Sequence, residues 1–225
     1  IRWDLSVTKC DYTLSCNYGI GKPNTNGFIN GWKKISFDGE MDKSKNNYYL
    51  QKGDKQLGLL PLNDNLLLIL DNNNRLLTGN GGWSYTLCNK NPVSGNDLNY
   101  IPQQPVLSDS MTFTGRTPCA GIPGYPAGSD CYKLKWSVVL YGDTKTNQAT
   151  GLRIRGTFSD HQILTGNWSI IKGKNGRYLY QLNIAAKNEP LYLLRLDENL
   201  LLFTDANENP LIGNEDFSYT LNTEH

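Results

Sequence analysis

Residues 57–87 read LGLLPLNDNLLLILDNNNRLLTGNGGWSYTL, and residues 191–221 read LYLLRLDENLLLFTDANENPLIGNEDFSYTL. The two stretches align without a gap at a constant offset of 134 positions, and more than half of their 31 positions are identical. The identities include Asn65, Asp71 and Gly79, each of which recurs at the same offset. Chance similarity between Leu-rich strands would not keep such residues in register. We therefore interpret the chain as carrying an internal duplication.

The repeated unit has the pattern of a β-meander. In the second copy an apolar run ends at Asp197, and Asp and Asn tolerate the left-handed conformations of tight hairpins. An apolar return strand follows at 200–203, then a second turn at 205–209 and a third turn at Gly213. Residues 217–221 alternate apolar and polar side chains, which predicts a half-buried closing strand.

Further alternation precedes the second copy. It predicts strands over 133–141, 152–158, 163–172 and 178–184. About eight or nine strand candidates, separated by turn signals, lie between Met111 and Leu221. This count favours an all-β fold of antiparallel meanders, with a lipocalin-like up-and-down β-barrel in the second half. An open sandwich with the same number of strands is the alternative.

Three parts of the chain follow from this pattern. We expect a smaller duplicated β module in 1–90, a linker rich in Pro, Asn and Ser in 91–109, and the barrel in 110–225. The first copy lacks room for all the early strands of the second. We expect it to form either a reduced barrel or a half-sheet that is completed by packing on the second copy.

The composition bears on the classes of partner. The 225 residues carry a formal net charge of +1, so we expect no nucleic-acid partner. With balanced charge, Arg153, Arg155 and Arg195 are interpreted as part of a solvated sheet face. The longest apolar run, 66–70, is far shorter than the roughly 18 residues of a membrane-spanning helix, so no transmembrane segment is expected. Because the chain starts at Ile1, any signal peptide or lipid-anchoring cysteine is expected upstream.

Five cysteines are present: Cys10, Cys16, Cys88, Cys119 and Cys131. The first two and the last two lie within short, turn-rich segments, which favours local disulfides formed in an oxidising compartment. Five reduced, partly buried thiols in a cytosolic protein are the alternative. Cys88 is the odd one out.

Residues 114–131, TGRTPCAGIPGYPAGSDC, carry most of the chemical interest. A disulfide between Cys119 and Cys131 would close a loop of about 13 residues and stabilise the fold by roughly 2–3 kcal/mol. The functional alternative is a thiolate pair that binds a soft ion such as Cu(I). No His or Met stands nearby to complete such a site, which favours the disulfide.

No catalytic signature stands out. His161 is interpreted as a solvent-facing turn residue, and no G-x-S-x-G elbow accompanies it, which argues against a Ser/His/Asp triad. Asp71 and Asp205 could form paired carboxylates, as in glycosidases, but hairpin turns need Asp for structural reasons. We expect a protein that is not an enzyme and that holds no cofactor.

Several aromatic residues fall on the strand candidates. They fit strand cores, and the alternative is that some of them line a cavity or stack on a sugar. The candidate ligand-lining residues are Trp136, Trp168, Tyr178 and Tyr180.

The Cys119 segment resembles the NlpE family of bacterial copper-resistance lipoproteins, which opens a lipocalin-like barrel with a Pro-Cys turn before a long strand. The resemblance rests on the run from Phe113 to Cys119, on Gly166-Asn-Trp168 and on the strand-then-Asp pattern of 200–205. It covers roughly 110–222, with a weaker echo in 10–89. The family's cysteines are spaced C-x-x-C, whereas eleven residues separate Cys119 from Cys131.

The resemblance implies an envelope protein of a Gram-negative bacterium, located in the periplasm, attached to the outer membrane or extracellular. We expect a non-enzymatic exported protein that binds a small apolar ligand or an envelope partner protein. One alternative is copper handling or envelope-stress sensing through Cys119 and Cys131, with copper implied by the resemblance alone. A carbohydrate-binding module is the other alternative.

Overall fold

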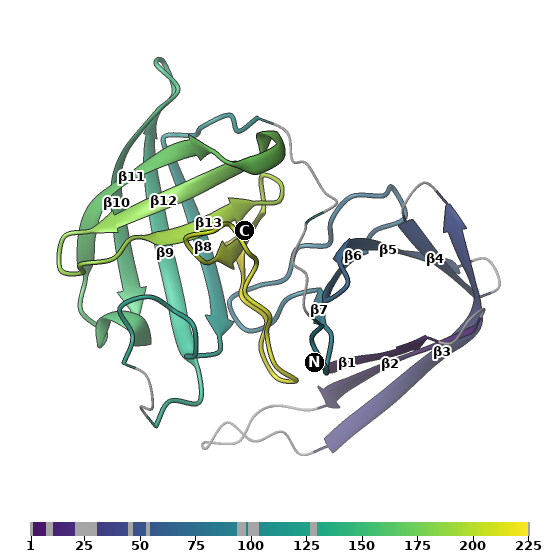
Figure 1. Ribbon diagram of the computed structural model, residues 1–225. Coiled ribbons are helices and arrows are strands. Elements are labelled where there is room, and N and C mark those ends of the chain that lie inside the picture. The colour runs from purple at the N-terminus through teal and green to yellow at the C-terminus, as the bar shows by residue number, and fades with distance from the viewer. Residues whose placement is uncertain are drawn as a thin grey trace. The chain divides into compact units, whose positions relative to one another are not determined.

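The computed structural model describes residues 2–7, 11–20, 31–44, 47–52, 55–93, 98, 104–126 and 130–224. Its regular elements are β-strands and two short 3₁₀ helices, η1 (Thr157–Ser159) and η2 (Lys174–Gly176), so the prediction of an all-β fold is confirmed (Figure 1). No helix in these ranges has the length and apolarity needed to cross a membrane.

Two compact units make up the chain. The first consists of Ile1–Pro61 and Leu67–Leu77, and the second of Leu62–Leu66 and Thr78–His225. The segment that ends the first copy of the repeat therefore belongs to the second unit, together with the barrel.

The second half forms a closed barrel of eight strands. In chain order they are β8 (Ser110–Thr117), β9 (Leu134–Asp143), β10 (Gln148–Gly156), β11 (Leu164–Lys172), β12 (Tyr178–Ile184), β13 (Leu191–Arg195), β14 (Leu200–Thr204) and β15 (Thr220–Thr223). Each strand pairs with the next in the chain, and β15 closes the barrel on β8 through Asn222 opposite Thr114. The predicted up-and-down barrel is confirmed, and the open-sandwich alternative is wrong.

Apolar side chains of alternate positions fill the inward face of the barrel, as the period of two requires. Those exposed by at most 1% include Phe113, Val138, Leu140, Ile154, Leu182, Leu193, Leu201 and Leu221. Cross-strand register brings several of them together, for example Phe113 opposite Val138 and Val138 opposite Ile154.

The first half forms a sheet that follows chain order. Its strands are β1 (Arg2–Val7), β2 (Asp11–Ile20), β3 (Gly31–Ser44), β4 (Asn47–Lys52), β5 (Lys55–Asn63), β6 (Leu66–Leu70) and β7 (Thr86–Cys88). The pairings from β1 to β5 are antiparallel. Of the two expected forms, the structure contains the sheet.

The closing strand β15 differs from the prediction of a half-buried strand. Both of its faces are covered, since Thr220 and Asn222 are each 1% exposed and Leu221 between them is fully buried. The inward face packs in the barrel. The outward face meets the end of the first repeat, where the Thr86 and Thr220 hydroxyl oxygens lie 2.8 Å apart. The alternation in the sequence could not reveal this second cover because the covering segment lies far away in the chain.

Candidate functional site

The aromatic residues expected to line a ligand cavity contact other side chains in the barrel. Trp136 is 3% exposed and stacks on Phe158 at a centroid distance of 4.6 Å, with Phe203 at 4.9 Å on another side. Its indole N–H donates to Thr117 Oγ1 at 2.9 Å. Its register partners on β8 and β10 are glycines, at 115 and 156, which leaves room for the large ring.

The other three rings lie on β11 and β12. Trp168 and Tyr180 are buried, with ring centroids 4.8 Å apart, and the Trp168 indole N–H donates to the Tyr141 carbonyl oxygen. Tyr178 is half-buried near the start of β12. Mutual packing and internal hydrogen bonds therefore occupy much of the surface that these rings would offer to a ligand.

Arg195 is a buried residue that the sequence interpretation placed on a solvated face. It is 8% exposed and shares the inward parity of Leu191 and Leu193 on β13. Burial raises the pKa of Tyr180 to about 12, while the charge of Arg195 and its hydrogen bond to the phenol act in the opposite direction. The solvated-face interpretation is therefore wrong for Arg195, although Arg153 is exposed.

The segment between β8 and β9 is closed by a disulfide between Cys119 and Cys131, with Cα atoms 6.1 Å apart. Both sulfurs are used in this bond, so neither is a thiolate that could bind Cu(I) without prior reduction. Cys10 lies outside the described residues, and Cys16 lies on β2, where its side chain is not described, so the structure leaves their pairing a prediction.

Cys88, at the end of β7, is a free thiol. Burial raises its pKa to about 11, and a hydrogen bond with the Gly213 backbone acts in the opposite direction. A thiol of this kind stays protonated near neutral pH and is a poor nucleophile or metal ligand.

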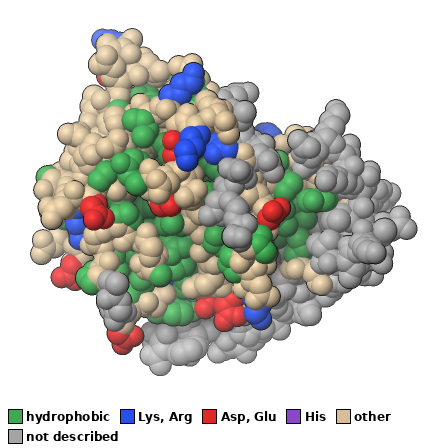
Figure 2. Space-filling view, viewed as in Figure 1, with side chains coloured by type: hydrophobic (Ala, Val, Ile, Leu, Met, Phe, Trp, Pro, Cys, Tyr) green, Lys and Arg blue, Asp and Glu red, His purple; other side chains and the backbone are tan. Residues whose placement is uncertain are grey.

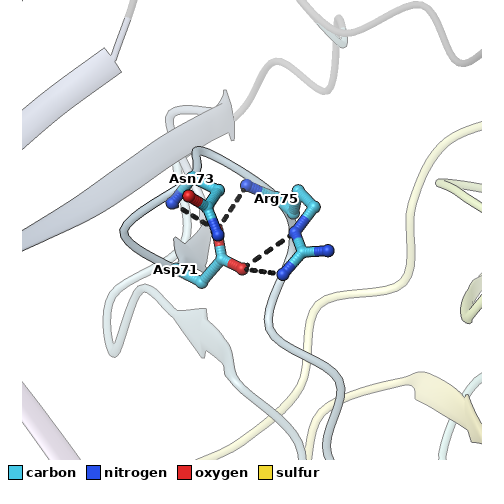
Figure 3. Close-up of polar contacts among 3 residues, drawn as sticks. All are labelled: Asp71, Asn73 and Arg75. Atoms are coloured by element: carbon cyan, nitrogen blue, oxygen red, sulfur yellow. Dashed lines mark hydrogen bonds and ion pairs between the residues drawn. The ribbon is translucent and has the colours of Figure 1, made fainter.

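Asp71 and Asp205, the two repeated aspartates, stabilise turns, in agreement with their interpretation as turn residues. The Asp71 carboxylate accepts the Asn73 and Arg75 backbone N–H groups at 2.8 and 2.9 Å and pairs with the Arg75 guanidinium at 2.8 Å (Figure 3). Asp205 accepts from the backbone of Asn207 and Asn209 at 2.8 Å each. The carboxylate oxygens are directed at their own loops, where backbone amides satisfy them.

An open cleft of about 500 Å³ lies on the second unit, where the end of the first repeat meets β8, β9 and β15. The residues that line it are Gly79, Asn80, Gly81, Thr114, Gly115, Arg116, Lys135, Trp136, Thr223 and Glu224. The cleft owes part of its openness to Gly81 and Gly82. A Cβ at Gly81 would lie 3.1 Å from Thr114 Oγ1, and one at Gly82 would lie 3.8 Å from Arg116 Nη1.

Two cations that line this cleft lie side by side on neighbouring strands. Arg116 on β8 and Lys135 on β9 are direct cross-strand partners. Like charges at such a position destabilise a sheet when nothing lies between them. Within the described part of the chain, no carboxylate is seen paired with either cation of the cleft. Lys133 adds a third positive charge, and burial together with Arg116 and Lys135 lowers the pKa of its ammonium group.

The sequence interpretation missed this cleft. The alternation over 133–141 predicts the strand that carries Lys135, but it does not show that Arg116 lies beside it, because that neighbour depends on the pairing of β8 with β9. Charge is otherwise mixed over the surface, since Figure 2 shows both basic and acidic side chains spread over the described part of that face. The composition therefore gave no hint of a local excess of cations.

No group of three or more His, Cys, Asp or Glu residues that could hold a metal ion occurs in the portion of the chain that the structure describes. Comparison with known proteins returned no matching family model, no matching curated protein and no matching solved structure.

Proposed function

We propose that the protein is a non-enzymatic, exported binding protein whose second unit takes an anionic group of a ligand or partner protein in the cleft between residues 79–82 and the β8–β9 pair. The observation that carries this proposal is the cross-strand pair of Arg116 and Lys135 in an open cleft, with no described carboxylate paired to either. Carboxylate and phosphate oxygens accept hydrogen bonds from both side chains, and a bound anion would relieve their repulsion.

The cleft is a better candidate than the barrel interior. The interior rings are engaged in packing, Trp136 with Phe158 and Trp168 with Tyr180. At the cleft, by contrast, Lys135 is exposed and Arg116 is half-buried. The expected ligand thereby changes from an apolar molecule to one that carries negative charge. Glu224 also lines the cleft and would disfavour an anion bound close to it.

Export and an envelope location remain part of the proposal. The Cys119–Cys131 disulfide supports an oxidising compartment, because such bonds are rare in reducing ones. The resemblance to the NlpE family supports the periplasm or outer membrane of a Gram-negative bacterium, with a lipid anchor upstream. Copper handling through Cys119 and Cys131 would require that the disulfide first be reduced.

Binding of anions to the full-length chain tests the proposal. Inorganic phosphate and a short polyglutamate peptide serve as probes in calorimetric titrations at low ionic strength. We expect binding that weakens with salt and falls about tenfold or more in Arg116→Gln and Lys135→Gln, as expected when a charge-assisted hydrogen bond is lost. Arg153→Gln, which removes an exposed cation from another strand, is the matched control.

The variant Gly82→Asp provides a second test of the anion site. It places the residue of the second repeat beside Arg116 and is expected to supply the negative charge that a ligand would otherwise bring, so binding of both probes is lost. Binding of phosphate alone assigns the site to small anions, and binding of the peptide alone assigns it to an acidic protein partner. Failure of both probes to bind, or an equal loss in Arg153→Gln, overturns the proposal.

A further inference from the structure

Two hydrogen bonds between residues 79–88 and residues 213–222 join equivalent positions of the two copies of the repeat. The Ser84 hydroxyl oxygen lies 2.6 Å from that of Ser218, and Thr86 lies 2.8 Å from Thr220 in the same way. Each pair is separated by 134 positions, the offset of the repeat. Each of these residues therefore contacts its own counterpart in the other copy.

The flanking contacts obey the same rule. The Gly79 N–H donates to Asn222 Oδ1 at 2.8 Å, and the Gly213 N–H makes the reciprocal hydrogen bond with Cys88. Gly213 is the counterpart of Gly79, and Asn222 is the counterpart of Cys88. In an interface with two-fold symmetry, a residue on the axis contacts its own counterpart in the other copy. A contact away from the axis occurs twice, with the roles of the two copies exchanged. The four contacts described here follow this pattern, which is that of an isologous interface. All four contacts lie within the second unit.

We infer that the outward face of residues 218–222, formed by Ser218 and by Thr220 and Asn222 of β15, is a self-complementary surface that recognises a second copy of the same segment. Within one chain the first repeat supplies the partner. When residues 79–88 are displaced, the geometry points to β15 of another molecule of this protein as the replacement, which would give a two-fold dimer.

The chemistry of the face supports a second copy as the occupant. Two β15 segments would pair serine with serine and threonine with threonine, as now. The Cys88 thiol, a weak acceptor, would be replaced by the amide oxygen of a second Asn222, which is a strong acceptor. The hydrogen bonding would be at least as good as in the present arrangement.

The intact chain nevertheless favours its own segment. In a pair of two such segments, Glu215 would take the place of Gly81, where an added Cβ would lie 3.1 Å from Thr114 Oγ1. The first repeat also belongs to the same molecule, so its effective concentration exceeds that of a free partner. Exchange is therefore expected only after residues 79–88 are displaced.

The test uses the full chain with the described free thiol removed by Cys88→Ser. Ser84→Arg with Thr86→Arg displaces the first segment, and Ser218→Cys places a thiol on the expected axis. We expect a concentration-dependent dimer in sedimentation velocity and, on oxidation, a reducible covalent dimer about tenfold above control, since the axis brings the two thiols together. The matched control carries Thr146→Cys, an exposed position in the turn between β9 and β10.

A second experiment keeps the native interface. Ser84→Cys with Ser218→Cys is expected to form a disulfide within one chain, which peptide mapping detects in the monomer. The inference is overturned if this pair stays reduced in air while Cys119 and Cys131 are bonded. It is also overturned if the displaced chain keeps its near-ultraviolet dichroism yet remains monomeric, or if the thiol introduced at position 218 cross-links no more than the thiol introduced at position 146.

Discussion

The segments 79–87 and 213–221 share a backbone conformation while facing different surroundings. In each, the backbone N–H of the asparagine donates to the backbone carbonyl oxygen three residues later. The distance is 2.9 Å both from Asn80 to Trp83 and from Asn214 to Phe217. In each, the glycine before the asparagine leaves no room for a side chain, since an added Cβ would lie 2.8 Å from the Cα of the following serine at 84 or 218. The identical residues of the two segments therefore form the same turn in each copy and the contact between the copies.

The two segments differ at three positions, and two of these, 81 and 82, lie beside the cleft, while the third exchanges Trp83 for Phe217. Gly81 and Gly82 in the first correspond to Glu215 and Asp216 in the second. The absence of side chains at 81 and 82 leaves the approach to Arg116 open. Gly79, Asn80, Ser84 and Thr86 thus have identical counterparts in the second copy, whereas the residues at 81 and 82, which lie nearest Thr114 and Arg116, do not.

The largest effect is expected from the pair Cys88 and Asn222. Burial raises the pKa of Cys88 from 9.0 to about 11, so the unfolded chain ionises first as the pH rises. Stability that is fully present below pH 9.0 is therefore lost towards pH 11, by roughly 2–3 kcal/mol. Cys88→Asn, which installs the residue of the second copy, is expected to remove this loss in urea titrations at about pH 8 and about pH 11.

Tyr180 supplies the internal reference for that experiment. Burial raises its pKa to about 12, so the wild type and Cys88→Asn must both retain the alkaline destabilisation that this phenol causes. Tyr219 is no such reference, because its pKa is raised by burial and also by the charge of Cys88. An equal alkaline loss in the wild type and in Cys88→Asn would show that the thiol does not titrate between the folded and unfolded states as described.

The second prediction concerns the paired glycines. Gly79→Ala and Gly213→Ala are each expected to lower the free energy of unfolding by about 1–3 kcal/mol, because the new Cβ overlaps the backbone of its own turn. The loss should be larger at Gly213, where the Cβ would also lie 2.9 Å from the Cys88 sulfur. Urea denaturation followed by circular dichroism measures both.

Gly151→Ala is the control for this prediction. Its Cβ would meet only ordinary contacts, from Tyr141 at 3.8 Å and from the Gly166 carbonyl oxygen at 3.9 Å, so little stability should be lost. If Gly79→Ala cost no more than Gly151→Ala, the close approach in the shared turn would not explain why glycine stands there in both copies.

Much of the barrel could be predicted because its signals are local. The alternation over 178–184 predicted β12 with its observed bounds, and turn residues separated the strands of the meander. The strand expected over 152–158 instead ends at Gly156, whose φ of 141° breaks the extended chain, and Phe158 lies in η1. That boundary depends on a glycine conformation that the apolar pattern does not encode.

The candidate site could not be predicted in the same way. The repulsion between Arg116 and Lys135 exists only because β8 and β9 pair in a particular register, which the linear sequence does not state. Arg195 is different, since its parity with Leu193 on β13 could have placed it inside the barrel. The balanced composition indicates a solvated face, whereas the period of two along the strand indicates an inward side chain.

The smallest effect is expected from the second turn of each repeat, at Arg75 and its counterpart Asn209. The Arg75 guanidinium is largely exposed and pairs with Asp71 at 2.8 Å, whereas the Asn209 amide donates to Asp205 at 2.9 Å. Because salt screens exposed ion pairs, Arg75→Asn should lower the unfolding midpoint slightly at low salt and leave it unchanged at high salt. The reverse exchange, Asn209→Arg, should introduce a salt-dependent contribution in the second copy.

The stability of the wild type and of Arg75→Asn can also be compared at acid pH. The Arg75 backbone N–H, ahead of the other contacts, lowers the pKa of Asp71 from its usual 3.8. The stabilisation is therefore present above pH 3.8 and is lost as the pH falls through the lower value of the folded chain. The difference between the wild type and Arg75→Asn should disappear over the same range, because a protonated Asp71 no longer attracts the guanidinium. A difference that persists in acid or at high salt would mean that Arg75 acts through packing and not through its charge.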